Sequence, residues 1–175
     1  MQKSVSDQVV EMLVAAGVSR IYGMAGDALH PFMEALQRDA RIRWVHVRHE
    51  ETAAFAASAE AQLTGELAVC CGSCGPGNLH LINGLYDACR SAAPVLAIAA
   101  HLPTLQIGTH YIHETHPTFF FRECAAYAEL VSRPRQLPPV LAEAMRMARA
   151  RSGVGMLVLP GDVAGMPCVD DAAES

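Results

Sequence analysis

Short apolar blocks alternate with amphipathic stretches along most of the chain. The blocks have the length of β-strands, and the stretches between them repeat apolar positions every three or four residues, as one face of a helix does. Strands are predicted at residues 18–22, 42–47, 67–71, 94–100, 127–131 and 155–160. Helices are predicted to begin at or near Ser4, Pro31, Glu50, Asn78 and Pro138. This regular alternation predicts an α/β protein.

Local signals agree with these boundaries. Ser4 and Asp7 have the spacing of a capping box, while Gly17 and Gly65 are suited to end helices. The block at 67–71 is apolar throughout, as expected for a strand that is covered on both faces. We therefore predict a doubly wound, mainly parallel six-stranded sheet with helices on both faces and right-handed crossovers.

Composition excludes several classes of protein. The chain has 175 residues, 51% hydrophobic and 18% charged, which suits one folded domain and argues against disorder. A formal net charge of -5 gives no general attraction to nucleic acid, so no nucleic-acid partner is expected. We find no apolar run of membrane-spanning length and no signal-peptide core, and therefore expect a cytoplasmic protein with reduced cysteines. The expected domain covers residues 1–167, with 168–175 as a linker or tail.

A carboxylate stands where the predicted second strand meets the next helix. Glu50 follows Arg48 and His49 and opens an alanine-rich segment. Ligands of doubly wound sheets bind outside the carboxyl ends of strands, so Glu50 is our first candidate for a catalytic residue. Acidic side chains are also favoured in the first turn of any helix, because they interact with the positive end of its dipole. Position alone leaves both interpretations open.

Two glycine-rich turns could present backbone N–H groups to a phosphate. They lie at residues 23–26 and 72–78 and follow predicted strands. Neither has the G-x-G-x-x-G pattern or the Walker A sequence. A tight turn that lets backbones pack closely is the alternative interpretation of each.

Two groups of residues have side chains of the types that bind metal ions. Three histidines and a glutamate fall within residues 110–116, but their spacing fits no regular element. Cys71 and Cys74 have C-x-x-C spacing, but no second pair accompanies them. We predict no metal site in this chain.

Three motifs occur in a characteristic order. They are Arg48-His49-Glu50-Glu51 before the alanine-rich segment, Gly75-Pro76-Gly77-Asn78, and Pro-Val-Leu-Ala-Ile at 94–98. Together they resemble the pyrimidine-binding (PYR) domain of thiamine-diphosphate enzymes, over nearly all of the chain to about residue 167. Longer stretches at 60–70, 74–85, 97–103 and 157–163 are similar to the FAD-carrying bacterial pyruvate oxidases, the quinone-linked pyruvate dehydrogenases.

This resemblance implies definite chemistry. The family's glutamate at the position of Glu50 hydrogen-bonds N1′ of the cofactor's aminopyrimidine and promotes the imino tautomer, whose nitrogen takes the proton from thiazolium C2. The implied reaction is oxidative decarboxylation of pyruvate to acetate and CO₂ with a quinone as acceptor. The implied cofactors are thiamine diphosphate, Mg²⁺ and FAD. The residues implied to line the cofactor side are Gly26, Gly75, Pro76, Gly77 and Asn78.

The long loop predicted at residues 101–117 departs from the family pattern. The resemblance places Tyr111, Ile112, His113 and Glu114 on the flavin side of the domain. Related enzymes usually carry Phe-Gln-Glu where this chain reads Ile-His-Glu at 112–114.

The family's PP domain binds Mg²⁺ and the diphosphate through a Gly-Asp-Gly stretch that ends in Asn-Asn. This chain has two asparagines, Asn78 and Asn83, and no such stretch. We therefore expect the N-terminal domain of a longer enzyme, inactive alone, with the PP and FAD domains as partners and self-association through the PYR domain. The full enzyme would be cytoplasmic or peripheral at the inner face of the membrane.

Three alternatives stay open. The same domain could belong to an acetolactate synthase or another 2-oxo acid decarboxylase or carboligase. It could instead be a stand-alone, non-catalytic domain for binding or dimerisation. An ordinary dinucleotide-binding domain would need G-x-G-x-x-G after the first strand, and the turn at 23–26 does not fit that pattern.

Overall fold

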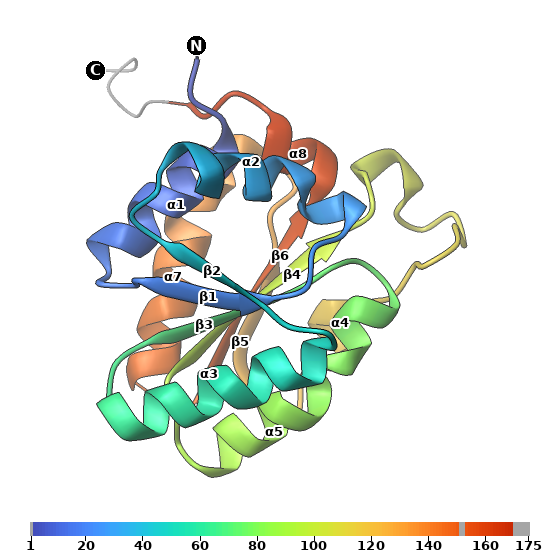
Figure 1. The fold of residues 1–175 in the computed structure, drawn as a ribbon. Coiled ribbons are helices and arrows are strands. Elements are labelled where there is room, and N and C mark those ends of the chain that lie inside the picture. Colours follow the sequence, from blue (N-terminus) through green and yellow to red (C-terminus); the bar gives the residue numbers. More distant parts are fainter. Residues whose placement is uncertain (1, 151–152, 170–175) are drawn as a thin grey trace.

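A single parallel sheet organises the computed structural model, which describes residues 2–150 and 153–169 (Figure 1). The strand order is β2-β1-β3-β4-β6-β5, and each neighbouring pair is parallel. The strands are β1 (Arg20–Gly23), β2 (Arg43–His46), β3 (Ala68–Gly72), β4 (Val95–His101), β5 (Ala125–Leu130) and β6 (Val154–Pro160). The predicted α/β class and six-stranded sheet are confirmed, and the pairing is parallel throughout.

Helices cover both faces of this sheet. Helices α1, α2, α7 and α8 pack on one face, and α3 and α5 lie side by side on the other (Figure 1). The α-helices are α1 (Val5–Ala15), α2 (His30–Arg38), α3 (Glu50–Thr64), α4 (Pro76–His80), α5 (Ile82–Arg90), α6 (Pro117–Phe120), α7 (Leu137–Ala150) and α8 (Gly161–Gly165). Short 3₁₀ turns occur at Asp27–Leu29, Thr104–Gln106 and Pro134–Gln136.

The sheet separates two hydrophobic cores. Strands β3, β4 and β6 are buried along their whole length, because apolar side chains on both of their faces meet helices. The alanines of α3 allow α5 to approach closely: a Cβ at Gly84 would lie 2.5 Å from the Cβ of Ala54. Small side chains in the segment after Glu50 therefore serve packing inside the domain.

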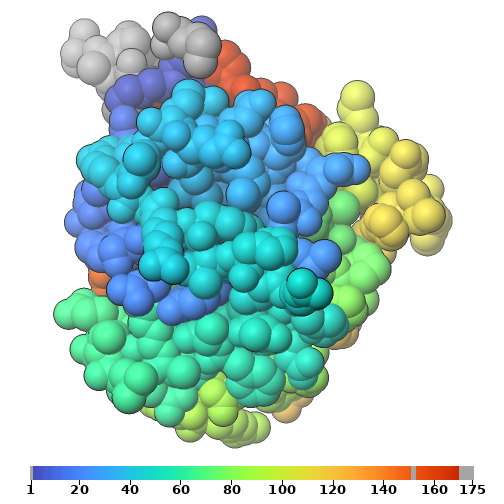
Figure 2. All heavy atoms as spheres, viewed as in Figure 1, coloured from blue at the N-terminus to red at the C-terminus, as the bar shows by residue number. Residues whose placement is uncertain are grey.

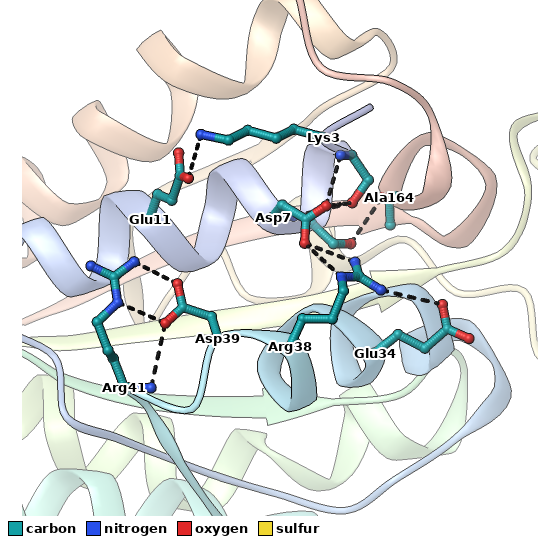
Figure 3. Close-up of polar contacts among 10 residues, drawn as sticks. Lys3, Asp7, Glu11, Glu34, Arg38, Asp39, Arg41 and Ala164 are labelled. Carbon is teal, nitrogen blue, oxygen red and sulfur yellow. Dashed lines mark hydrogen bonds and ion pairs between the residues drawn. The ribbon is translucent and has the colours of Figure 1, made fainter. Parts of the chain in front are cut away.

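The predicted capping box begins α1. The Ser4 Oγ atom accepts from the backbone N–H of Asp7, and the Asp7 carboxylate accepts from the backbone N–H of Ser4. Arg38 of α2 donates to the same carboxylate at 2.7 Å, which ties α2 to α1 (Figure 3). The neighbouring pairs Lys3–Glu11 and Arg41–Asp39 are more exposed, and such pairs contribute little to stability.

Several boundaries differ from the sequence prediction. The single helix expected to begin near Asn78 is divided into α4 and α5, and the long loop contains a 3₁₀ turn before α6 closes it. Strand β1 ends at Gly23, one residue later than expected. In the expected tail, the N–H of Cys168 donates to the carbonyl of Lys3 at 2.9 Å, and residues 170–175 lie outside the described residues. Across the described residues, no helix has the length and hydropathy needed to cross a bilayer.

Candidate functional site

The sheet reverses its winding between β1 and β3, and the candidate residues gather there. Strand β2 lies on one side of β1, whereas β3 and the later strands lie on the other. The turns that follow β1 and β3 therefore meet beyond the same end of the sheet, and α3 begins beside them (Figure 1). Such a switch point is the usual ligand-binding place of a doubly wound fold.

Glu50 is the first residue of α3, and only 6% of its surface is exposed. Its Oε2 atom lies 3.1 Å from Nδ1 of His80, the last residue of α4. The positive end of the α3 dipole also favours a negative charge at this position. A nearly buried carboxylate is thus held by a helix N-terminus and by one side chain from another element.

Two histidines flank this carboxylate. His49 is the N-cap of α3, and its Nδ1 accepts from the backbone N–H of Glu51 at 3.3 Å. Its ring stacks on that of His80, with centroids 4.3 Å apart and an interplanar angle of 25°. Both side chains are about half exposed, at 48% for His49 and 43% for His80. Solvent therefore reaches the outer side of the pair while Glu50 lies beneath it.

Glycines of the second turn make room for Glu50. A Cβ at Gly77 would lie 2.9 Å from Oε1 of Glu50, so a side chain there would press on the carboxylate. Gly75 has a φ of +64° and precedes Pro76 at the start of α4. A Cβ at Gly75 would lie 2.6 Å from that of His113. The turn therefore packs against Glu50 and against the long loop at once.

Gly26 and Asn78 occupy different parts of this region. Gly26 lies against Ser73, so the turn after β1 contacts the turn after β3 with no space for a side chain between them. Asn78 is fully buried, and its Nδ2 donates to the carbonyl of Ala100 at 2.7 Å. The side chain of Asn78 thus faces β4, and its contact fixes the start of α4 on the sheet.

The long loop follows β4 and projects from the body of the domain (Figure 2). Tyr111, Ile112 and His113 are exposed, and His113 has a φ of +69°. The Glu114 carboxylate accepts the backbone N–H of Gly108, and the hydrogen bonds from Gly108, His110 and Tyr111 lower the pKa of Glu114. In this structure Glu114 therefore organises the loop backbone.

A cavity of about 460 Å³ lies between this loop and the body of the domain. Tyr111, Ile112 and His113 line one side, and Cys74 and Pro31 line the other. A second hollow of about 530 Å³ lies between α1 and α2, where Asp7, Arg38 and their neighbours pair with one another (Figure 3). The first cavity adjoins the glycine turn, so it is the one related to the candidate site.

Cys71 and Cys74, the C-x-x-C pair, are both free thiols. Burial raises the pKa of Cys71 well above its ordinary value, and the neighbouring Cys70 and Glu50 add to this effect. Burial also raises the pKa of Cys74. A raised pKa keeps a thiol protonated, which opposes both nucleophilic and metal-ligand roles.

Sequence reasoning did not single out His80 as a partner of Glu50. The two are 30 residues apart and meet only because α4 packs against the start of α3. The signal present in the sequence was a histidine just after a glycine turn that itself follows a buried strand. That signal places His80 at the ligand-binding end of the sheet, but it does not predict the contact with Glu50.

A buried glutamate and a glycine turn at the switch point of a doubly wound sheet are the features by which this domain is compared with known families. The family model for the "Thiamine pyrophosphate enzyme, N-terminal TPP binding domain" matches residues 3–119. The chain belongs to this family, as the N-terminal domain of a thiamine-diphosphate enzyme. The resemblance found in the sequence is thereby confirmed.

Individual relatives refine the comparison. The chain is 62% identical over 160 residues to an uncharacterised 42.6 kDa protein of Pseudomonas amyloderamosa, matching 91% of this chain and 40% of that protein. It is 40% identical to pyruvate oxidase of Lactiplantibacillus plantarum over 89% of this chain and 26% of that enzyme. It is 35% identical to a chloroplastic acetolactate synthase of Nicotiana tabacum, with 90% and 24% covered. The chain thus spans 40% or less of the length of these curated relatives.

Proposed function

We propose that this chain is the PYR domain of a thiamine-diphosphate- and FAD-dependent pyruvate:quinone oxidoreductase, and that Glu50 activates the cofactor's aminopyrimidine. The observation that carries the proposal is the burial of Glu50 at the switch point, with one carboxylate oxygen held by His80 and the other beside Gly77. The similarity to pyruvate oxidase supports the choice of reaction.

The residues present fit the pyrimidine part of thiamine diphosphate. A ring nitrogen needs a carboxyl group in a nearly dry place, with an oxygen free to share a proton. Oε2 of Glu50 is engaged by His80, and Oε1 lies on the side of the glycine turn. When bound, thiamine diphosphate supplies the electron sink that decarboxylation of a 2-oxo acid requires.

Each residue around Glu50 then has a stated task. Glu50 holds the shared proton at Oε1, and His80 donates to Oε2, because a carboxyl oxygen that carries no proton can only accept a hydrogen bond. Gly26, Gly75, Pro76 and Gly77 shape a wall without bulky side chains on the cofactor side. Asn78 positions α4 by its bond to the carbonyl of Ala100.

The loop at 111–114 forms the flavin side in this proposal. Tyr111, Ile112 and His113 line the cavity beside the glycine turn, and Glu114 holds the loop in shape. Mg²⁺, the diphosphate and most of FAD are bound by PP and FAD domains outside this chain. The self-association of PYR domains belongs to the same proposal.

Acetolactate synthase is the second candidate, because relatives with that name match nearly the whole chain at 35% identity. A stand-alone binding domain is less favoured, because such a domain has no need of a buried carboxylate in this place. The size of the native polypeptide separates these classes. An antibody against this domain should detect a product near three times 18.7 kDa; a product near 18.7 kDa, with no separate PP-domain subunit bound to it, would contradict the proposal.

The reaction itself is tested on the assembled enzyme. Incubation with pyruvate, thiamine diphosphate, Mg²⁺ and FAD should yield acetate and CO₂ only when a quinone is supplied. Formation of acetolactate from pyruvate, without a need for the quinone, would replace the oxidase by the synthase.

A further inference from the structure

Three donors of the kinds that bind transition metals meet at the start of α3. One ring nitrogen each of His49 and His80 and one carboxylate oxygen of Glu50 lie within 4.8 Å of one another. We propose that these three residues form a binding site for a divalent transition metal ion, with Zn²⁺ as its natural occupant. The site belongs to the domain while thiamine diphosphate is not bound.

The ligand set suits Zn²⁺ better than Mg²⁺ or Ca²⁺. Two imidazoles and one carboxylate are a known three-ligand zinc set that leaves a fourth position for water, whereas Mg²⁺ and Ca²⁺ prefer oxygen ligands. Neither histidine is buried, so water and the ion reach the ring nitrogens. The buried Glu50 adds the negative charge that such an ion requires.

The distances need only a small adjustment. Two ligands of one tetrahedral zinc lie roughly 3.3–3.5 Å apart, because each is about 2.0–2.2 Å from the ion. His80 and Glu50 are already at 3.1 Å. The His49 nitrogen lies within 4.8 Å of the other two donor atoms, so its half-exposed ring has to move by at most about 1.5 Å, and it can give up its long 3.3 Å contact with the N–H of Glu51.

The rings of His49 and His80 are already close to each other. They stack with 4.3 Å between centroids and an interplanar angle of 25°, and one nitrogen of each ring lies within 4.8 Å of a carboxylate oxygen of Glu50. Each belongs to a separate element, since His49 caps α3 and His80 ends α4. The ion would therefore cross-link the start of α3 to the end of α4 and stabilise the domain by its binding free energy.

A consequence concerns the cofactor, and this part alone rests on the proposed function. A metal ion bound to Glu50 occupies the carboxylate that the aminopyrimidine needs. Transition metal and thiamine diphosphate would then exclude each other at this end of the domain, and the metal would slow cofactor loading.

Co²⁺ titration of the untagged, cofactor-free 175-residue chain tests the site, because Co²⁺ reports its coordination by visible absorption. We expect one tightly bound Co²⁺ per chain, displaced by one equivalent of Zn²⁺, with an absorption intensity typical of four-coordinate cobalt. His80→Asn and His49→Asn should each weaken binding tenfold or more. Asparagine is a good N-cap, so the second variant keeps the start of α3.

His110→Asn is the matched control. His110 is an exposed loop histidine with a φ of +57°, a conformation that asparagine adopts readily, and it should leave Co²⁺ affinity unchanged. No saturable Co²⁺ binding, or equal binding by wild type and His80→Asn, would overturn the proposed site. Because this titration contains no thiamine diphosphate, its failure leaves the proposed function standing. Co²⁺ binding followed by full thiamine diphosphate binding to the metal-loaded assembled enzyme would overturn the mutual exclusion.

Discussion

His80 Nδ1 lies 3.1 Å from Oε2 of Glu50, and the two side chains come from different helices. The contact uses one carboxylate oxygen and leaves the other beside Gly77. A catalytic carboxyl group that must exchange a proton at one oxygen benefits from a fixed partner at the other, because the partner holds its orientation. The start of α3 and the end of α4 thus define the geometry of the site together.

Replacing His80 tests this positioning role. In the assembled enzyme, His80→Leu removes the donor to Oε2, while His80→Gln keeps a donor of similar reach. We expect C2–H exchange of bound thiamine diphosphate to slow by roughly tenfold in the leucine variant, since an unpartnered buried polar group costs about 1–3 kcal/mol. The glutamine variant should restore most of the rate. Equal exchange in both variants and wild type would remove His80 from the mechanism.

Gly77→Ala should weaken cofactor binding without unfolding the domain. The added Cβ would lie 2.9 Å from Oε1 of Glu50, so the carboxylate must move. Overpacking of this kind costs about 1–3 kcal/mol, which corresponds to a loss of thiamine diphosphate affinity of roughly 5- to 150-fold. Titration of the assembled enzyme with the cofactor measures it.

Gly65→Ala is the control for that substitution. Gly65 ends α3 with a φ of +74°, and a Cβ there meets no atom within 4 Å in the structure. This variant should lose about 1 kcal/mol of folding stability from backbone strain and keep its cofactor affinity. The opposite pattern would show that Gly77 does not adjoin the cofactor.

His101 should make the stability of the domain depend on pH. It is 3% exposed, and burial lowers its pKa below the usual 6.5, with Glu114 opposing and His116 adding to the shift. The unfolded chain binds a proton below about pH 6.5 that the folded chain resists, so this contribution to stability is present above pH 6.5 and is lost as pH falls through the folded pKa. Urea unfolding at several pH values between 5 and 7.5 gives the free energy of unfolding as a function of pH. This free energy should change less with pH in His101→Gln than in the wild type.

The matched control is His110→Gln, because His110 is exposed in the same loop region. In this variant the free energy of unfolding should change with pH as it does in the wild type. If His101→Gln leaves the pH dependence of the unfolding free energy unchanged, that dependence comes from other groups.

Asp162 holds the first turn of the long loop against the body of the domain. Its carboxylate accepts from the N–H of Thr104 at 3.0 Å and from the hydroxyl of Thr104 at 2.6 Å. Asp162→Ala should therefore expose residues 104–116 to proteases several times faster, with little change in global unfolding. Limited proteolysis followed by mass spectrometry locates the cleavage. Thr104→Ser keeps both hydrogen bonds to Asp162 and should be cleaved as slowly as the wild type. If Asp162→Ala is cleaved first in another segment, Asp162 does not hold this loop.

Much of the fold was predictable because its signals are local. Apolar blocks marked the strands, Ser4 and Asp7 marked the first helix, and Gly65 marked the end of α3. The strand order was not predictable from periodicity, since it depends on which helices bury which faces. The division between α4 and α5 was also missed, because the whole segment from 78 to 90 has helical composition.

For the site, the position of Glu50 was predictable and its surroundings were not. A strand–helix junction places Glu50 at the ligand-binding end of a doubly wound sheet. Its contact with His80 and the inward direction of Asn78 arise from tertiary packing across 22 to 30 residues. The same is true of Gly75 against His113, which joins the glycine turn to the loop.

The central claim is that Glu50 activates thiamine diphosphate. Its most direct test is the rate of C2–H exchange of the bound cofactor in the assembled enzyme, for wild type and Glu50→Gln. Exchange is started by dilution into D₂O, stopped with acid and measured by NMR. Glutamine keeps the size and hydrogen-bonding capacity of the side chain but cannot carry the proton. We predict that exchange slows by about a hundredfold or more while cofactor binding is largely retained, since general acid–base groups contribute at least about that factor. An exchange rate equal to that of the wild type would contradict the account.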